Sequence, residues 1–465
     1  MNILRGNSFS EIVGAPPWFG GMLRRHLAIP LEPTSDKAQQ RERDLRFGRT
    51  FMHEGMPWGS LVRDDGRVPS GLTAHVLALA KHYNEPCGLI DRRKRPEDNI
   101  PWWCVRAPAS GWRPYQDEVH KQIIRYGSGV IDAPPRSGKT LMAARAVDAI
   151  ALPTIYIAPS VQIVRQTYET FVSHFGEELV SRLDGDATDA QRDVSKPIVI
   201  ATFASAVRQS VEWWATREVL VIDEFHHAAA ETYHRINELA VNAYYRLCFT
   251  GTHFRSGQDE LAMQAIASQV LYRIPISYLV QNGYIAAPRI VQFPVRTRSL
   301  EHLPYDEAYD EGIVKCDDRN QLIVKLATGL ANAGVPTIVL TKRRQHADVL
   351  GDLIPESVVV KGGENSLTSH AVKAFCDGRG YVLVGTSVIG EGVDVPRAGA
   401  LVYASSGDAT VQMMQSYFRP LTAREGKTTG LIYDFADRHH STLARHSANR
   451  RSFAEKYIGT RVVTF

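Results

Sequence analysis

The chain has 465 residues, of which 44% are hydrophobic and 22% are charged, and this balance predicts a globular protein of two or three domains. No run of about 18 apolar residues occurs, so we expect no transmembrane helix, and we expect no membrane partner. The start, Met1 to Gly6, lacks the apolar core of a secretory signal. The five cysteines are scattered and none are spaced C-x-x-C. We therefore expect reduced thiols and a cytoplasmic protein (in a host cell, if a phage encodes it), not a disulfide framework or a zinc site.

The surplus of positive charge lies in the first quarter of the chain. Residues 1–112 hold 16 Lys/Arg and 12 Asp/Glu, and the rest of the chain holds 38 of each sign, which accounts for the net charge of +4. The densest basic run is Asp91-Arg92-Arg93-Lys94-Arg95-Pro96. A run of this kind either contacts nucleic-acid phosphates or forms a solvated loop, and composition alone leaves both readings open.

Two stretches precede the regular part of the chain. Residues 1–44 show no sustained periodicity, and we expect a poorly ordered N-terminal extension. Residues 45–112 predict a small α+β accessory domain that could bind nucleic acid, with an amphipathic helix over 71–81 that aligns Leu72 and Val76. The pair Trp102-Trp103 follows, and it either packs in a core or stacks on bases.

From Arg113 onward, strands and helices alternate as in βαβ units, which predicts two tandem parallel-sheet domains over 113–283 and 284–465. The polar clusters follow directly after apolar strands, where ligands bind to parallel sheets. In the first domain we expect helices over 117–126 and 141–150 and strands over 129–131, 154–158, 196–201, 218–222 and 245–249. In the second we expect strands over 336–340, 358–360, 381–384, 400–403 and 430–433, and a helix over 410–417.

The first of these clusters is a glycine-containing loop, Ala133-Pro134-Pro135-Arg136-Ser137-Gly138-Lys139-Thr140, between a strand and a helix. Backbone N–H groups at such a helix start attract an anion. Lys139 can reach the β- and γ-phosphates of a nucleotide, and the Thr140 hydroxyl can bind Mg²⁺. Ala133 replaces the first glycine of G-x-x-x-x-G-K-T, so a chance Gly-Lys-Thr remains the alternative.

Adjacent carboxylates, Asp223 and Glu224, follow another strand. Hydrolysis of a nucleoside triphosphate requires one carboxylate near Mg²⁺ and another that orients water. We assign Asp223 to the metal and Glu224 to the water, with an ordinary acidic turn as the alternative. His226 and His227 have no third ligand at useful spacing, so we favour phosphate sensing or an interdomain contact over zinc.

A cation from outside the loop would stabilise charge on the transferred phosphoryl group. Arg419 and Arg424, in the second domain, are the candidates. Each could instead be a solvated surface arginine.

Together these motifs resemble superfamily two DEAD/DEAH-box-like helicases and translocases, most closely the XPB-like and phage UvsW-like branch. The similarity covers about residues 113–435 and follows the family order of motifs. The matching motifs are Arg113-Pro114-Tyr115-Gln116, Gly138-Lys139-Thr140, Ala158-Pro159, Asp223-Glu224-Phe225-His226, Thr250-Gly251-Thr252, Gly385-Thr386, Glu391-Gly392-Val393-Asp394 and Gln415 to Arg419.

The resemblance implies two RecA-like domains that bind ATP and Mg²⁺ between them. It assigns Gln116 to adenine, Thr250 and Thr252 to coupling, and Arg419 to an arginine finger. Matched nucleotide-contacting positions are Arg113, Gln116, Arg136, Ser137, Gly138, Lys139, Thr140, Gly392 and Asp394. Matched nucleic-acid contacts, to the backbone and largely independent of sequence, are Pro159, Ser160, Thr202, Lys342, Arg343 and Thr386.

The chain departs from the family pattern at three places. Arg136 replaces a loop glycine, which could crowd the phosphates or pair with them, and His253 replaces a common proline. In the last motif, Q-x-x-G-R-x-x-R, the glycine is Phe418 and the second arginine is Thr422. Arg424 could substitute for that arginine, because Pro420 must perturb a helix there.

The sequence therefore predicts an ATP-dependent helicase or translocase that acts on DNA rather than RNA, with branched or duplex remodelling favoured by the UvsW-like resemblance. The changes at Phe418 and Thr422 motivate an alternative, a nucleotide-gated binding or remodelling component with little turnover. No feature indicates an obligate oligomer, so we expect a monomer.

Overall fold

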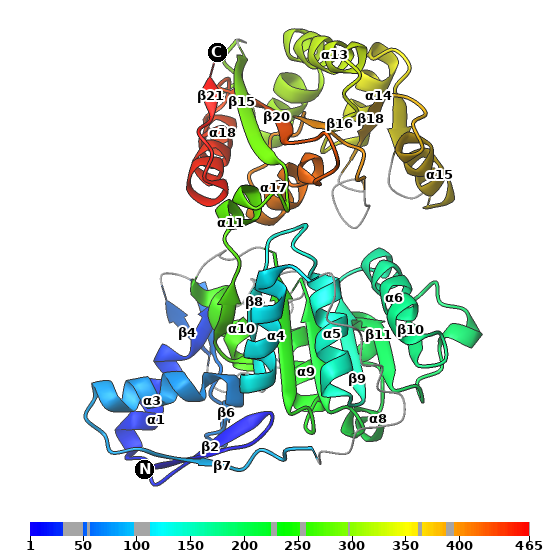
Figure 1. The fold of residues 1–465 in the computed structure, drawn as a ribbon. Coiled ribbons are helices and arrows are strands. Elements are labelled where there is room, and N and C mark those ends of the chain that lie inside the picture. Colours follow the sequence, from blue (N-terminus) through cyan, green and yellow to red (C-terminus); the bar gives the residue numbers. More distant parts are fainter. Residues whose placement is uncertain are drawn as a thin grey trace. The chain divides into compact units, whose positions relative to one another are not determined.

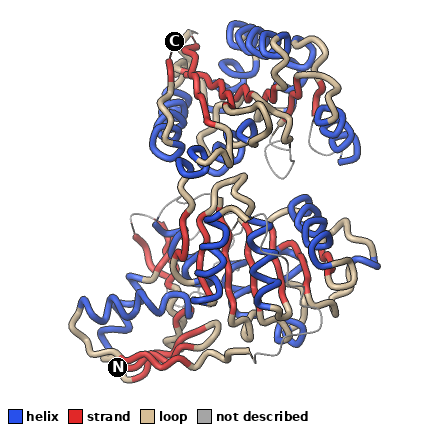
Figure 2. The backbone as a smooth tube through the Cα atoms, viewed as in Figure 1, coloured by secondary structure: helices blue, strands red, loops and turns tan. Residues whose placement is uncertain are grey.

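The computed structural model describes residues 1–30, 50–53, 56–96, 112–224, 230–251, 257–295, 298–360, 365–386 and 395–464 (Figures 1 and 2). The chain divides into two compact units. The first unit comprises Met1–Ala133 and Gly138–Arg273, and the second comprises Pro134–Ser137 and Ile274–Phe465. Within the described residues, no helix is both long and apolar enough to cross a bilayer.

The N-terminal module of the first unit packs two small sheets and two helices around one apolar core. One sheet has the order β6-β2-β1-β7, in which β1 pairs antiparallel with β2 and parallel with β7, and the other is antiparallel with the order β3-β5-β4. Phe19 of α1 and Val76 of α3 lie in the shared core. The elements are β1 (Asn2–Arg5), β2 (Phe9–Val13), α1 (Pro17–His26), β3 (Ala28–Pro30), β4 (Thr50–His53), β5 (Met56–Ser60), β6 (Val68–Pro69), α3 (Thr73–His82) and β7 (Gly88–Asp91).

The expectation that residues 1–44 form a poorly ordered extension is wrong for residues 1–30. This segment forms β1, β2, α1 and β3, and Ile3, Phe19 and Leu23 are buried in the core. Its strands have only three to five residues, and α1 contains the weak helix formers Gly20 and Gly21. These elements share a core with α3, which was itself correctly predicted. Residues 31–49, and the pair Trp102-Trp103, lie outside the described residues.

The module is packed directly against the α/β part of the same unit. Arg246 of β13 is buried and donates to Ser8 Oγ (2.7 Å), Asn237 Oδ1 (2.5 Å) and the Ala240 carbonyl. These acceptors are neutral, and burial lowers the pKa of Arg246 to about 9. At Gly71, a Cβ would lie 1.9 Å from the Gln264 carbonyl oxygen. This close approach explains why the contact requires glycine.

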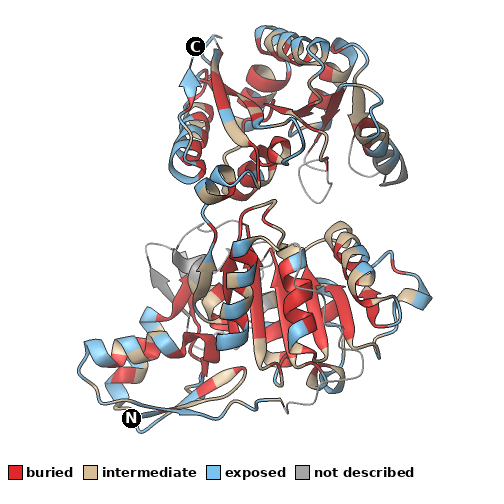
Figure 3. Cartoon of the chain, in the orientation of Figure 1, coloured by how far each residue is buried: buried red, intermediate tan, exposed pale blue. Residues whose placement is uncertain are grey.

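The first large sheet has seven parallel strands in the order β10-β11-β9-β12-β13-β8-β14. Its central strands β8, β9 and β12 are buried at every position (Figure 3), as expected for parallel strands covered on both faces. The elements are α4 (Pro114–Tyr126), β8 (Ser128–Asp132), α5 (Lys139–Ile150), β9 (Thr154–Ala158), α6 (Val161–Phe175), β10 (Val180–Leu183), β11 (Ile198–Thr202), α7 (Phe203–Ala206), α8 (Val211–Ala215), β12 (Val219–Asp223), α9 (Ala230–Leu239), β13 (Tyr245–Thr250), α10 (Gly257–Ala267) and β14 (Val270–Arg273).

The second unit repeats this architecture, with seven parallel strands in the order β17-β18-β16-β19-β20-β15-β21. Two π-helical segments, Asp310–Val314 and Ala454–Ile458, continue helices. The other elements are α11 (Ile276–Gln281), β15 (Ala287–Val295), α12 (Tyr305–Tyr309), α13 (Asp317–Asn332), β16 (Thr337–Leu340), α14 (Arg344–Leu353), β17 (Val358–Val360), α15 (Asn365–Cys376), β18 (Val382–Gly385), β19 (Ala400–Tyr403), α17 (Thr410–Tyr417), a 3₁₀ turn (Arg419–Leu421), β20 (Thr429–Asp437), α18 (Ser441–Phe453) and β21 (Val463–Thr464).

The predicted fold class, two parallel α/β domains with a small mixed N-terminal module, is confirmed. The sequence did not predict β10, β14, β15 or β21. β15 contains Pro288 and Pro294, which sequence reasoning takes as evidence against a strand. β14 and β21 are edge strands of four and two residues, and such short segments give too little sequence pattern to identify a strand.

Candidate nucleotide site

The loop between β8 and α5 forms a tight turn that ends at a helix N-terminus. Ser137 donates to the Pro134 carbonyl from both its backbone N–H (3.2 Å) and its hydroxyl (2.7 Å). Gly138 caps α5 in the left-handed conformation, with φ of 84°. The first N–H groups of α5 are therefore directed toward the loop, as in a phosphate-binding site.

Arg136 also adopts a left-handed conformation, with φ of 70°. Only glycine adopts this conformation without strain, and the cost for another residue is about 1–2 kcal/mol. The backbone thus explains why a glycine is expected at this position, and the arginine is accommodated at the expense of local strain.

The two adjacent carboxylates lie at the end of β12, beside the loop lysine. Lys139 Nζ is 2.7 Å from Glu224 Oε1. Asp223 Oδ2 accepts from the Tyr156 hydroxyl at 2.8 Å, and Asp223 Oδ1 accepts from the Glu224 N–H at 3.0 Å. Glu224 has φ of 46°, an unusual conformation for this residue type that turns the chain sharply after Asp223. Sequence-distant segments therefore bring Lys139, Asp223 and Glu224 together.

The electrostatics of this cluster favour an additional cation. Burial, and then the neighbouring Glu224 carboxylate, raise the pKa of Asp223 to about 6. Burial alone would lower the pKa of Lys139, but the carboxylates of Glu224 and Asp223 raise it above its usual value. Two carboxylates thus surround one ammonium group, and a divalent metal would relieve their repulsion.

The Gln116 side chain lies against the same loop. Its Oε1 accepts from the Arg113 N–H at 3.1 Å at the start of α4, and a Cβ on Gly138 would lie 2.7 Å from its Nε2. The Arg113 guanidinium donates to the Tyr115 hydroxyl at 3.0 Å. The structure therefore places the Gln116 side chain in contact with the phosphate loop. The Arg113 guanidinium is held by Tyr115 of the same helix.

Tyr156 is a site residue that sequence reasoning missed. It occupies the middle of β9, is buried, and donates to Asp223. Burial, followed by the Asp223 charge, raises the pKa of Tyr156 well above its usual value, so it remains a donor. The only sign of it in the sequence is a tyrosine hydroxyl among the apolar residues of the strand Thr154–Ala158. A tyrosine at this position also fits ordinary core packing.

In the second unit, the helix of the last motif ends before Pro420, as expected from the disruption that proline causes in a helix. α17 ends at Tyr417, and Arg419 begins a short 3₁₀ turn. Phe418, in place of the family glycine, is almost completely buried. Arg424 is exposed in a tight turn, and its backbone forms an antiparallel bridge with the backbone of Lys427. Four residues discussed for the nucleotide site, Thr252, His253, Gly392 and Asp394, lie outside the described residues, as do His226 and His227.

Three predicted nucleic-acid contacts lie at neighbouring strand ends of the first sheet. Pro159 and Ser160 follow β9, and Thr202 ends β11, which pairs with β9. The Ser160 hydroxyl accepts from the Ile163 N–H at 3.3 Å, and the Thr202 hydroxyl accepts from the Ser205 N–H at 3.3 Å. Both hydroxyls therefore cap helices, and the N-termini of α6 and α7 lie side by side at this edge.

The three predicted contacts in the second unit follow β16 and β18, which also pair with each other. Lys342 Nζ lies 5.4 Å from the centre of the Tyr309 ring. Arg343 forms ion pairs with Asp306 and Asp310, both at 3.0 Å. Thr386 is buried directly after β18. Arg343 is therefore partly neutralised by protein carboxylates, whereas no ion pair of Lys342 is found among the described residues.

A buried arginine–aspartate pair lies at the end of β20 in the second unit. Arg319 Nε is 2.9 Å from Asp437 Oδ1, and both side chains are completely buried. Arg319 Nη1 also donates to the Ala404 carbonyl at 2.8 Å. Asp437 Oδ2 accepts from the Ser406 hydroxyl at 2.9 Å. These bonds hold the segment that follows β19.

A second pair lies beside the first. Arg450 Nε is 3.0 Å from Asp434 Oδ1, and Asp434 Oδ2 accepts from Gln292 Nε2 at 3.0 Å. Arg450 Nη2 donates to the Phe435 carbonyl at 2.7 Å, and its Nη1 donates to the Gly407 carbonyl at 3.4 Å. Together, the two pairs fix residues 404–407, which lead into α17.

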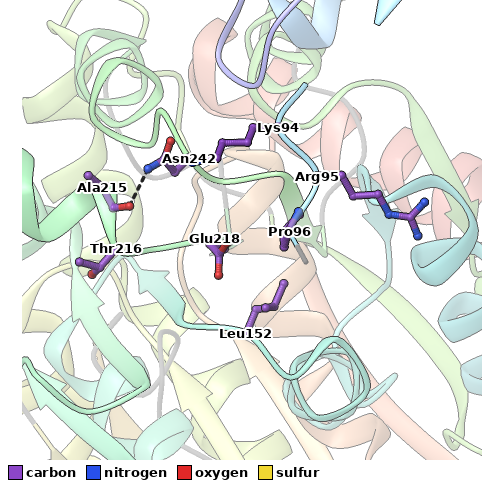
Figure 4. Close-up of a pocket in the computed structure, with 8 residues that line it drawn as sticks. All are labelled: Lys94, Arg95, Pro96, Leu152, Ala215, Thr216, Glu218 and Asn242. Carbon is purple, nitrogen blue, oxygen red and sulfur yellow. Dashed lines mark hydrogen bonds between the residues drawn. The ribbon is translucent and has the colours of Figure 1, made fainter. Parts of the chain in front are cut away.

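A separate hollow of about 510 Å³ lies at the amino-terminal edge of the first sheet (Figure 4). Glu218 precedes β12, Leu152 lies before β9, and Lys94 and Arg95 come from the N-terminal module. Burial raises the pKa of Glu218. Because the phosphate loop and Asp223 lie at the opposite, carboxyl-terminal ends of the strands, this hollow is distinct from the nucleotide site.

Comparison with known proteins agrees with this geometry. Residues 110–255 match the family described as "Type III restriction enzyme, res subunit". The chain is 23% identical over 349 residues to the ATP-dependent DNA helicase UvsW of Enterobacteria phage T4, covering 71% of this chain and 68% of that protein. It is 25% identical over 371 residues to the DNA 3'-5' helicase XPB of Kineococcus radiotolerans, covering 76% of this chain and 65% of that protein.

Among solved structures, a fragment of a putative HsdR subunit of a type I restriction enzyme from Vibrio vulnificus has a similar fold. It superposes with a TM-score of 0.60 at 15% identity, over 93% of this chain and 83% of the fragment. The chain thus has the fold of two tandem RecA-like domains, and it is similar in sequence to helicases of superfamily two. Within that superfamily, the relatives that it resembles are of the XPB and UvsW type.

Proposed function

We propose that the chain is an ATP-dependent DNA helicase or translocase. The observation that carries this proposal is the contact of the phosphate-loop Lys139 with Glu224, 2.7 Å apart, beside a second buried carboxylate, Asp223. This arrangement has the lysine and the two acidic groups that phosphoryl transfer requires. The similarity to proteins named as DNA helicases supports DNA as the substrate.

The residues of the site fit ATP with Mg²⁺. Gly138, Lys139 and Thr140 present N–H groups at the start of α5, with the Ser137 turn before them and the strained Arg136 beside them. Thr140 and Asp223 would hold the metal, which would neutralise charge on the phosphates. Gln116, held by the Arg113 N–H, would recognise the adenine edge.

Lys139 and Glu224 form an ion pair that a phosphate can exchange. A phosphate at the loop would compete for the Lys139 ammonium, since it carries more negative charge than one carboxylate. Glu224 would then be released to orient and deprotonate the attacking water. Tyr156 would keep Asp223 in place by donating to the oxygen that does not face the Glu224 N–H.

The remaining roles rest on the motif match. Arg419 would stabilise charge on the transferred phosphoryl group, with Arg424 as a substitute for the missing second arginine. Gly392 and Asp394 would lie near the nucleotide. Backbone contacts to a DNA strand would come from Pro159, Ser160, Thr202, Lys342, Arg343 and Thr386. We expect the enzyme to act as a monomer in the cytoplasm.

The test is an ATPase assay with single-stranded, duplex and branched DNA and with RNA. We expect DNA to stimulate turnover, and Lys139→Ala and Glu224→Gln each to lower it by about 10²-fold or more. Lys121→Ala, an exposed charge removal on α4, is the matched control and should behave as wild type. Absence of ATP turnover with every nucleic acid would contradict the proposal. A comparison of unwinding on branched and on forked duplexes would distinguish branch remodelling from processive unwinding.

The altered last motif favours one alternative, a nucleotide-gated DNA-binding component with little turnover. Phe418 is a core residue, so no small residue is present where the family has glycine. If Arg419 acts as the arginine finger, Arg419→Ala should lower the rate of hydrolysis by about 10³-fold or more. Tight ATP-dependent DNA binding by the wild type with negligible hydrolysis would favour the alternative.

A further inference from the structure

The N-terminal module exposes an aromatic cluster on two helices. Trp18 at the start of α1 is 50% exposed and Tyr83, directly after α3, is 39% exposed. Their ring centres are 5.8 Å apart in an edge contact. His26 and His82 extend the cluster, with ring centres 6.3 and 4.9 Å from that of Tyr83. A contiguous exposed patch of large apolar side chains is a feature of binding surfaces.

The charges on the two helices that carry this cluster have one sign. α1 (Pro17–His26) and α3 (Thr73–His82) contain no aspartate or glutamate, and each ends in basic residues. Arg24 is engaged by Asp64 and by the Val62 carbonyl. Arg25 and Lys81 are exposed on the same two helix ends. The surface therefore combines partly exposed aromatic rings with positive charge.

We propose that Trp18, Tyr83, Arg25 and Lys81 form a binding site for single-stranded nucleic acid on the N-terminal module. Bases would stack on the rings, and the two cations would contact the backbone phosphates. This is the combination by which single strands are bound without sequence preference. The site deepens the proposed function, because it adds a grip on the strand from outside the two parallel-sheet domains.

The N-terminal module is packed against the first parallel-sheet domain, which gives such a binding site a fixed position. Arg63 of the module pairs with Glu238 of α9 at 2.7 Å, and Ser8 accepts from Arg246 of β13. α9 is the helix that follows the strand end carrying Asp223 and Glu224. A strand held by the aromatic cluster would therefore be fixed relative to the first domain.

The experiment measures binding of an oligothymidylate of about 16 nucleotides and of a duplex of equal length to the full chain without nucleotide, by fluorescence anisotropy. We expect Trp18→Ala to weaken single-strand binding by about 5- to 100-fold, with a smaller effect on the duplex. Trp18→Phe should retain most of the affinity, because it keeps a ring that can stack. Arg25→Ala and Lys81→Ala should each reduce the salt dependence by about one phosphate contact.

Tyr126→Ala is the matched control, since Tyr126 is 43% exposed at the end of α4 with Arg125 over its ring. Unchanged single-strand affinity in a Trp18→Ala/Tyr83→Ala double variant that retains the wild-type melting temperature would overturn the proposal, as would an equal loss in Tyr126→Ala. A loss confined to the duplex would overturn it too. The ATPase assay is independent of this measurement, so a protein that binds through Trp18 but hydrolyses no ATP refutes only the proposed enzyme function.

Discussion

Each large sheet ends in buried carboxylates, and the two sets differ in how they are compensated. At the end of β12, Asp223 and Glu224 share one flexible lysine. At the end of β20, Asp434 and Asp437 each face an arginine and also accept from neutral donors. The first set is short of positive charge, whereas the second set has charges and hydrogen bonds in balance.

This difference distinguishes the cluster that we propose to bind nucleotide from a structural one. A buried carboxylate that is fully paired contributes a fixed position and has nothing to exchange with a ligand. A cluster whose charge is incompletely offset keeps a raised pKa, as Asp223 does at about 6, and gains most from a bound cation. We therefore expect substitutions in the first cluster to change chemistry, and those in the second to change stability.

The largest effect should come from Glu224→Gln. The amide cannot accept a proton from water, so turnover should fall by about 10²- to 10⁴-fold, while thermal stability should change little. Single-turnover ATPase measurements with a parallel melting curve would check this. If the rate stays within tenfold of wild type, Glu224 is not the water-activating group.

A matched pair of isosteric substitutions tests the comparison directly. Asp437→Asn leaves the buried Arg319 without its counterion and should lower the free energy of unfolding by about 3–5 kcal/mol. Asp223→Asn removes a charge that burial already disfavours, so it should change the free energy by less than about 1 kcal/mol. Both are measured by urea unfolding in EDTA. Similar losses in the two variants would remove the distinction between the clusters.

The buried His346 should make the stability of the second unit fall at acid pH. Its Nε2 is 2.9 Å from Asn320 Oδ1, and burial, followed by the Arg319 charge, lowers its pKa to about 3. Unfolded histidine binds a proton near 6.5, so the folded chain binds fewer protons between these values. Its contribution to stability is therefore lost as pH falls below 6.5, by up to about 1.4 kcal/mol per pH unit.

His346→Gln should flatten this dependence. The measurement compares urea midpoints of wild type and variant at about pH 7 and about pH 5, and the gap between the two proteins should shrink or reverse at the lower pH. His302→Gln, at an exposed position, is the control and should follow wild type. An unchanged gap would show that His346 is protonated in the folded state.

The smallest effect is expected at the end of α5, the helix that follows the phosphate loop. Ala151 has φ of 55° at the helix C-cap, a conformation that glycine adopts without strain. Ala151→Gly should raise the free energy of unfolding by up to about 1 kcal/mol. Ala149→Gly, at an exposed position two residues earlier, should instead lower it by about 0.5–1 kcal/mol. A melting experiment in which both variants lose stability would contradict this account.

The nucleotide cluster was largely predictable from sequence because its parts carry local signals. Gly138-Lys139 precedes a helix, and Asp223-Glu224 follows an apolar strand, so a parallel sheet must bring them to one edge. Gln116 was found only through the resemblance. Tyr156 was missed, since a tyrosine in a buried strand is equally consistent with core packing.

The structural cluster could not be predicted in this way. Arg319 and Arg450 lie on α13 and α18, where the sequence gives no sign that they are completely buried. Their partners at the end of β20 are distant in the chain, and only the three-dimensional arrangement pairs them. The ordered start of the chain escaped prediction for a related reason, because β1 and α1 become stable only when they meet α3.

Arg246 has a consequence for how this protein can be divided or recombined. Its guanidinium is surrounded by neutral acceptors from β13's own neighbourhood and from Ser8, near the start of the chain. A version shortened to the parallel-sheet domains would leave this cation facing a gap, so we expect such a fragment to be insoluble. A recombined version of this protein should accordingly keep Ser8 and Arg246 together.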